Sequence, residues 1–203
     1  MILKDDYKST VVQDGDLVIK TFKSGHEFYV DDHEKFKNTC NQFSEMYGHF
    51  PKIIECDINK IIMEKVNGKP IDTILRSDNK MFFTSFDERV TFIKKIQYMY
   101  FKFISNLLEY NVENNISLKH NDLNCNNMII DGNKLICIDL DSVNINSTPI
   151  DHYFITFGAH EISKFINDIV YQSYVEKEKE ARKLNRHHRN EISKLREELG
   201  KNK

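Results

Sequence analysis

A short polar stretch followed at once by apolar residues constrains this fold more than any other feature of the chain. Residues 118–127 read LKHNDLNCNN, and Met-Ile-Ile follows at 128–130. An Asp-Gly-Asn turn then leads into LICIDLD at residues 135–141. Asp-Gly between apolar runs is typical of a β-hairpin turn. The pattern predicts a hairpin with a rigid polar loop before it and an acid, Asp139, just after its second strand.

The first third of the chain reads mainly as strands. Two apolar runs within residues 9–22 flank QDGD, which predicts a hairpin with Asp-Gly in its turn. Residues 30–48 have the spacing and end signals of a helix. Residues 52–57 and 60–66 predict two further strands joined by a short polar turn.

A long amphipathic helix is predicted to begin at Ser85, which forms a plausible capping box with Glu88. A short helix over 71–76 precedes it. Apolar residues recur along the long helix at steps of three and four, which indicates one buried face. They are Ile93, Ile96, Tyr100, Phe103, Leu107 and Tyr110. Such a stripe is more often core than cofactor site, and we interpret it as core.

Strands with one helix come first, and helices with a small hairpin follow, which predicts an α+β protein with two lobes. We expect an N-lobe of antiparallel sheet plus one helix at residues 1–66. A reduced, mostly helical C-lobe with the polar loop and Asp139 is expected at 67–175. A second apolar stripe is expected from about residue 155. Residues 176–203 are highly charged and predict a long C-terminal helix or tail.

The composition excludes several classes of protein. The 203 residues are 40% hydrophobic and 30% charged, so the chain can bury a core. A net charge of −2 does not suit a dedicated nucleic-acid binder, although the basic stretch 181–190 leaves such a contact open. The four cysteines form no C-x-x-C pair, as expected in a reducing cytosol. Without a signal peptide or a spanning segment, we expect a cytoplasmic protein with no membrane contact.

Three side chains around the hairpin predict a metal site. Asp122 lies in the polar loop, Asn127 lies at its end where the first hairpin strand begins, and Asp139 lies at the exit of the second strand. The hairpin can bring them to one rim. Carboxylate and amide oxygens are ligands that Mg²⁺ accepts, with phosphate oxygens completing the shell.

A lysine in the N-terminal half is the candidate phosphate ligand. Lys20 lies in the middle of the apolar run LVIKTF, where a lysine is costly unless its ammonium meets a partner. Glu34, in the first turns of the next helix, is the partner we expect, with Glu45 as a competitor. The alternatives without a functional role are that Lys20 extends to solvent from an edge strand and that Glu34 is favoured at a helix N-terminus by the helix dipole.

Together these stretches resemble the protein-kinase-like superfamily. HNDLNCNN is similar to its H-x-D-x-x-x-x-N catalytic loop, and LVIK to its V-A-I-K strand. ICIDLD resembles the D-F-G metal segment, and IIMEKVNGKPI the stretch that joins the lobes. DHYFITFG, from Asp151, resembles the start of the large-lobe helix. The resemblance covers roughly residues 7–170. The small size points to compact members such as the RIO-like and KEOPS-type kinases, and the chain is also similar to aminoglycoside-phosphotransferase-like kinases, which usually have a larger substrate domain.

The resemblance implies catalytic roles for residues that match the motifs. Asp122 would orient the attacking hydroxyl and accept its proton. Asn127 and Asp139 would hold Mg²⁺. Lys20 would contact the α- and β-phosphates of ATP and pair with Glu34.

The resemblance also implies a nucleotide pocket. Backbone groups near Glu64 and Val66 would meet the adenine. Ile129 and Ile138 would line the pocket around it, and His120 would brace the catalytic loop.

Two of the departures from the family pattern concern the phosphate and metal sites. No glycine-rich loop precedes LVIK, and hydroxyl or backbone N–H groups of Ser9 and Thr10, near the expected loop tip, would have to substitute. The D-F-G glycine is replaced by Asp141, as in the IDFD and IDFE forms of aminoglycoside- and choline-type kinases. We interpret Asp141 as a loop acid, with a second metal contact as the alternative.

The resemblance implies an ATP- and Mg²⁺-dependent phosphotransferase. We expect a small atypical Ser/Thr protein kinase, because few residues follow Asp151 to build a domain around a small substrate. The alternatives are a small-molecule kinase of the aminoglycoside or choline type and a nucleotide-binding pseudokinase or partner-binding module. A protein substrate is expected, and the basic C-terminal helix is a candidate docking element.

Overall fold

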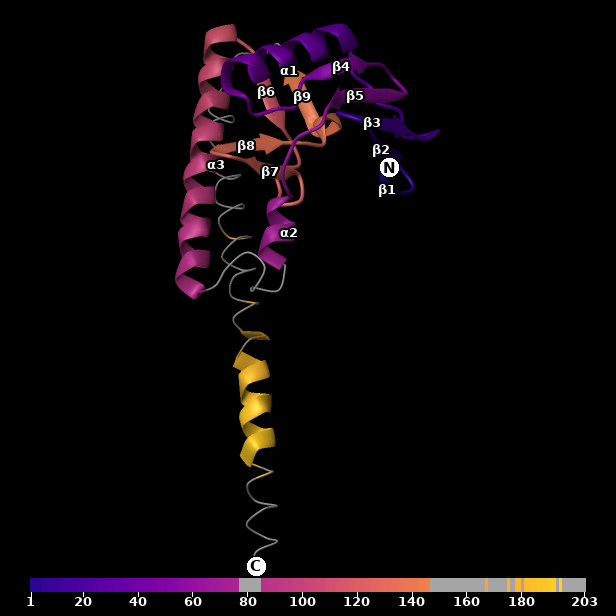
Figure 1. The fold of residues 1–203 in the computed structure, drawn as a ribbon. Coiled ribbons are helices and arrows are strands. Elements are labelled where there is room, and N and C mark those ends of the chain that lie inside the picture. Colours follow the sequence, from indigo (N-terminus) through magenta and orange to yellow (C-terminus); the bar gives the residue numbers. More distant parts are fainter. Residues whose placement is uncertain are drawn as a thin grey trace, which may run out of the picture.

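The chain combines antiparallel β-sheet with α-helices (Figure 1). The computed structural model describes residues 1–76 and 85–146 without a break, and beyond them residues 167, 175, 178, 179, 181–192 and 194. The DHYFITFG stretch and the apolar stripe expected after it lie outside the described residues, apart from residue 167. Residues 181–192 are helical and exposed.

The largest sheet has five antiparallel strands in the order β1-β2-β3-β5-β4. The strands are β1 (Ile2–Asp5), β2 (Ser9–Asp14), β3 (Leu17–Phe22), β4 (Ile53–Cys56) and β5 (Lys60–Glu64). The predicted hairpin between β2 and β3 is confirmed. Its connection is Gly15-Asp16, and Gly15 has φ +57°, a conformation that costs glycine little. Lys20 lies on the central strand, opposite Val11 and Ile61.

Helix α1 (His33–Tyr47) packs against this sheet through β4 (Figure 1). The Asp32 side chain caps its first turn by accepting the Lys35 N–H at 2.9 Å. Gly48 ends it in the left-handed region, at φ +70°. The inward face carries Phe36, Cys40 and Phe43, spaced by four and three residues and each at most 3% exposed. This spacing sets which side of α1 meets the core.

Helix α3 (Phe86–Asn114) is the longest described element, and a short helix α2 (Ile71–Arg76) precedes it. The Ser85 hydroxyl accepts the Glu88 N–H at 3.2 Å, so the predicted start of α3 is confirmed. Ile93 is partly buried, and the other members of the predicted stripe are at most 2% exposed. These are Ile96, Tyr100, Phe103, Leu107 and Tyr110. The stripe is core, as predicted.

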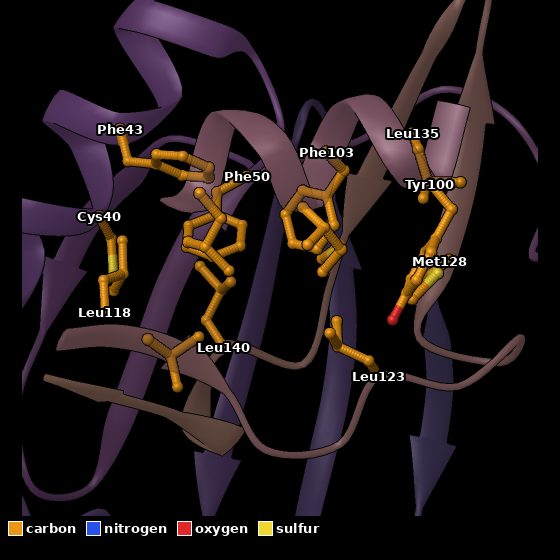
Figure 2. Packing of buried hydrophobic residues seen from close by; sticks show 14 of the residues in the cluster. Cys40, Phe43, Phe50, Tyr100, Phe103, Leu118, Leu123, Met128, Leu135 and Leu140 are labelled. Carbon is orange, nitrogen blue, oxygen red and sulfur yellow. The ribbon is translucent and has the colours of Figure 1, made fainter. Parts of the chain in front are cut away.

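The core joins α1, α3 and the hairpin region. Figure 2 shows the rings of Phe43, Phe50 and Phe103 grouped together. The Phe43 ring centroid lies 4.9 Å from that of Phe50 and 6.4 Å from that of Phe103. Such aromatic packing fixes how α1 lies on α3.

Two short antiparallel pairs carry the polar loop. Strand β6 (Ser117–His120) pairs with β9 (Val143–Asn146), and β7 (Met128–Asp131) pairs with β8 (Lys134–Cys137). The predicted hairpin is confirmed, with Gly132 at φ +60° in its turn. Among the described parts of the chain, no helix has the length and hydropathy needed to cross a membrane.

Candidate active site

Lys20 points from the central strand into a cluster of acids. Its side chain is 8% exposed, and its ammonium donates to Oδ1 of Asp139 and Oδ1 of Asp141. The ammonium also lies 5.6 Å from the ring centroid of Phe22. A lysine this buried is stable only with counter-charges, so β3 is bound electrostatically to the stretch that follows β8.

The backbone after β8 explains why both acids reach Lys20. Asp139 adopts φ +67°, which is uncommon outside glycine, and a 3₁₀ turn (Leu140–Ser142) follows. Leu140, between the two acids, is completely buried. The side chains of Asp139 and Asp141, on either side of it in the sequence, are 30% and 25% exposed and both reach the Lys20 ammonium.

The two carboxylates share one positive charge. Burial raises the pKa of Asp139, but the Lys20 ammonium more than offsets this, so its pKa lies below the ordinary value. Burial and the neighbouring Asp139 carboxylate together raise the pKa of Asp141, and Lys20 offsets them only in part. The Lys20 ammonium thus favours the charged form of both acids, against the effect of their burial.

His120 connects the polar loop to this turn. Its Nε2 lies 2.9 Å from the Ile138 carbonyl oxygen, and its Nδ1 accepts the Asp122 N–H at 3.2 Å. Because a carbonyl oxygen only accepts, Nε2 must carry the imidazole proton. Burial lowers the pKa of His120, although the Ile138 carbonyl and nearby acids oppose this shift. A neutral His120 thus fixes the position of Asp122 relative to the residue before Asp139.

Two asparagine amides orient the Asp122 carboxylate. Asn124 Nδ2 donates to Oδ1 at 2.8 Å, and Asn127 Nδ2 donates to Oδ2 at 2.9 Å. The Asn124 Oδ1 accepts the Asn126 N–H at 2.9 Å, which fixes which end of its amide faces Asp122. The structure therefore brings Asp122 and Asn127 together, and it brings Lys20 and Asp139 together. The Ile138 N–H donates to the Asn127 carbonyl at 2.8 Å and so joins the two pairs.

A cavity of about 1060 Å³ opens beside these groups. Lys20, Asp122, Asp139 and Asp141 line it. The β1–β2 region, the segment leading into α1 and strand β9 complete its walls, with Tyr7, Ser9, His26, Tyr29 and Asn144 among their residues.

The loop between β1 and β2 is built by an acid in place of glycines. Asp6 Oδ1 accepts the N–H groups of Lys8 and Ser9, each at 2.8 Å, and Asp6 also pairs with Lys4 at 2.9 Å. The hydrogen bond from Lys4 and those from the two backbone N–H groups hold the pKa of Asp6 well below its usual range. Ser9 and Thr10 lie in β2 and not at the loop tip. The Ser9 N–H is bound to Asp6, and the Thr10 hydroxyl donates to Asp5 at 2.9 Å.

The expected pairing of Glu34 with Lys20 is not formed. The Glu34 side chain is 68% exposed and pairs with Lys37 at 2.8 Å. Glu34 precedes Phe36 by two residues, which is about 200° around the helix, so turning Phe36 into the core turns Glu34 outward. The competitor, Glu45, is exposed as well.

The four residues expected to surround an adenine are not part of this cavity. Glu64 and Val66 are at the end of β5 and just after it, and none of Glu64, Val66, Ile129 and Ile138 belongs to the lining of the cavity described above. Ile129 lies against the connection after β5, because a Cβ added to Gly68 would be 2.8 Å from its Cγ2. The structure thus places Ile129 against the connection after β5 and leaves all four residues outside the lining of the cavity that holds the acids.

Sequence reasoning underestimated several polar residues of this site. Asp141 is not a solvent loop acid, since its side chain is 25% exposed and paired with Lys20. The IDLD pattern carried that signal. Asp6 was also missed, although an aspartate two residues before a turn N–H is typical of an Asx turn.

No family model and no curated protein matches this sequence. Among solved structures, the complex of Rv3197 with erythromycin from Mycobacterium tuberculosis superposes with a TM-score of 0.51 at 11% identity. The match covers 74% of this chain and 47% of that protein, so the chain spans about half its length. An identity this low reports on the fold alone.

Two aminoglycoside phosphotransferases superpose more loosely. ADP-bound APH(2'')-Ib has a TM-score of 0.37 at 18% identity, with 71% of this chain and 66% of that chain covered. The streptomycin–ATP complex of APH(2")-IIa has a TM-score of 0.33 at 16% identity, with 72% and 67% covered. The chain shares its fold with the Rv3197 structure. The lysine strand, the polar loop and the carboxylate turn follow one another in the order expected from the protein-kinase-like resemblance.

Proposed function

We propose that this protein is an ATP- and Mg²⁺-dependent phosphotransferase that transfers the γ-phosphate to a hydroxyl group. The observation that carries the proposal is the contact of the Lys20 ammonium with Asp139, beside an Asp122 carboxylate that faces the same cavity. A cation, a metal-binding acid and an acid that can accept a proton are the parts that phosphoryl transfer requires.

The residues present fit a magnesium ion. Asn127 directs its amide nitrogen at Asp122, so its amide oxygen is the end available to a metal. Asp139 adds a carboxylate on the adjoining stretch of chain, and both are hard oxygen ligands. When bound, Mg²⁺ would neutralise charge on the phosphates. Asn127 and Asp139 are the residues that would hold it.

The protein's own groups then have distinct tasks. Lys20 would bind oxygens of the α- and β-phosphates. Asp122 would align the acceptor hydroxyl and accept its proton as the oxygen attacks the γ-phosphorus and the bond to the β-phosphate oxygen breaks, releasing ADP. The amides of Asn124 and Asn127 hold Asp122 in one orientation, so catalysis rests mainly on positioning.

The proposal also assigns the two parts of the chain. Residues 1–66 would act as the N-lobe and residues 67–175 as a reduced C-lobe, with adenine between them. The Glu64 carbonyl and the Val66 backbone would contact the adenine. The carbonyl of Glu64 and not its N–H is proposed, because that N–H already donates to the Lys52 carbonyl at 2.9 Å. Ile129 and Ile138 would pack on its ring.

We propose a Ser or Thr hydroxyl of a protein as the acceptor. Asp122 is exposed, so a segment of another chain can reach it. Residues 181–192, which are helical and exposed, are the proposed docking element for such a partner.

A small-molecule acceptor is the second candidate, and the cavity favours it. Its volume of about 1060 Å³ is on the scale of small-molecule sites. Acids outnumber lysines in its lining, which suits an acceptor that carries amino groups. The acids are Asp6, Glu27, Asp31, Asp32, Asp122, Asp139 and Asp141, and the lysines are Lys4, Lys8, Lys20 and Lys35.

Two substitutions test the activity. Asp139→Ala should abolish the Mg²⁺-dependent rise in melting temperature that ATP gives the wild type. Asp122→Ala should keep that rise and lower turnover by roughly 10²–10⁴-fold, the usual contribution of a general base. Asp131→Ala, which replaces an exposed acid at the end of β7, is the matched control and should change neither quantity.

Transfer of labelled γ-phosphate to a generic protein, compared with a panel of amino alcohols, separates the two acceptor classes. Nucleotide binding with no transfer to either would indicate a nucleotide-binding module without catalysis. Unaltered turnover in Asp122→Ala would show that the base is assigned to the wrong residue.

A further inference from the structure

The second carboxylate on Lys20 has no role in the mechanism above. We infer that Asp141 is the positioning residue for Lys20, holding its ammonium toward the phosphates in place of an acid on α1. The inference deepens the proposed function and rests on it.

Helix α1 offers Lys20 no acid. Its inward face carries Phe36, Cys40 and Phe43, and Glu34 points to solvent, paired with Lys37. Aromatic rings fill the space between β3 and α1. The Phe28 ring centroid lies 5.7 Å from that of Phe22 on β3 and 5.1 Å from that of Phe36 on α1. An acid from α1 would have to displace this packing in order to reach Lys20.

Asp141 is held where it is by the turn around it. The Ser142 N–H donates to the Asp139 carbonyl at 3.0 Å, and the Ser142 carbonyl accepts the Asn121 N–H at 2.9 Å. Leu140 and Val143, on either side of this pair, are at most 4% exposed. The backbone that carries Asp141 is therefore fixed both to the core and to the polar loop.

The two acids would have different partners once a nucleotide is bound. Asp139 is the proposed metal ligand, so part of its negative charge would be shared with the metal. Lys20 remains almost buried and still requires a counter-charge. Lys4, another lysine whose charge interacts with these acids, is already paired with Asp6 at 2.9 Å. Asp141 is thus placed to hold Lys20 while Asp139 serves the metal. Without it, Lys20 would draw Asp139 away from that task.

The test compares Asp141→Asn with Asp141→Glu and with Glu34→Gln in the full chain. Affinity for Mg·ADP and for adenosine is measured by calorimetry, and KM for ATP and kcat by steady-state kinetics. Asp141→Asn should weaken Mg·ADP binding and raise KM for ATP by about tenfold, with adenosine affinity unchanged, because adenosine has no phosphate for Lys20. Asp141→Glu should restore Mg·ADP affinity to within about threefold of the wild type, and Glu34→Gln should match the wild type throughout.

Each result decides the matter. Tighter Mg·ADP binding by Asp141→Asn would mean that Asp141 competes for Lys20 and does not position it. An equal loss of adenosine affinity in Asp141→Asn would indicate a merely structural role and would overturn the inference. Weaker Mg·ADP binding in Glu34→Gln alone would assign the positioning of Lys20 to α1 and would overturn it as well. If the melting curve of Asp141→Asn shows that this variant is unfolded, the test rests on Asp141→Glu. A tenfold loss of Mg·ADP affinity in a folded Asp141→Glu variant would contradict the inference. A wild type that binds adenosine and Mg·ADP equally would instead refute the proposed function, and the role of Asp141 with it.

Discussion

Replacing Asn111 by alanine is expected to lower the free energy of unfolding by about 2–5 kcal/mol. Asn111 lies near the end of α3 and is completely buried. Its Nδ2 donates to the Leu118 carbonyl at 2.8 Å, and its Oδ1 accepts the Leu118 N–H at 2.7 Å. The side-chain amide thus pairs with β6 as a neighbouring strand would, and β6 leads directly to His120 and Asp122.

The magnitude follows from the two hydrogen bonds. Alanine leaves the N–H and C=O of a buried residue, Leu118, without this partner, at about 1–3 kcal/mol for each group. Alanine favours a helix over asparagine by at most about 0.7 kcal/mol, which offsets only a small part. The unpaired groups therefore outweigh the gain in helix propensity.

Chemical denaturation measures the effect, with Asn111→Leu and Asn114→Ala as companions. Leucine has nearly the shape of asparagine and leaves less room for water than alanine, so a similar loss would show that hydrogen bonds and not the cavity are responsible. Among the residues that the structure describes, Asn114 Nδ2 bonds to the Tyr110 carbonyl of its own helix at 2.8 Å, and its replacement should cost about 1 kcal/mol or less. A free energy of unfolding for Asn111→Leu within about 0.5 kcal/mol of the wild type is what a neutral surface change gives. That result would refute the claim that the two hydrogen bonds stabilise the fold.

Two further outcomes concern pH and glycine. Burial lowers the pKa of His49, which lies 2.7 Å from the Leu135 carbonyl, so its neutral form stabilises the fold above the ordinary value of 6.5. That stability should be lost as pH falls below 6.5, and denaturation curves of His49→Gln should show a weaker pH dependence there than the wild type; an equal slope would contradict this. Gly68→Ala should lower the melting temperature more than Gly132→Ala, because both have positive φ but only at Gly68 would the new Cβ meet backbone, 2.5 Å from the Ile130 oxygen. Equal losses would show that this close approach relaxes freely.

Local patterns were enough to predict most elements of this fold, although not β1 or β9. The turn at Gly132 marks a hairpin because left-handed backbone is easy for glycine. The stripe on α3 was readable because apolar residues at steps of three and four share one face of a helix. The closeness of Asp122 and Asn127 was also predictable, because both lie on one short, continuous stretch of chain.

Long-range packing decided the rest. The sequence offered Glu34 and Glu45 as partners for Lys20, and the partner besides Asp139 is Asp141, more than a hundred residues from the lysine. The choice depends on how α1 is rotated when its phenylalanines enter the core, and no local pattern encodes that angle. The loop between β1 and β2 likewise depends on Asp6 taking backbone N–H groups that a glycine-rich loop would present to phosphate. Periodicity and turn chemistry act within a few residues, whereas charge pairing depends on which distant surfaces the core brings face to face.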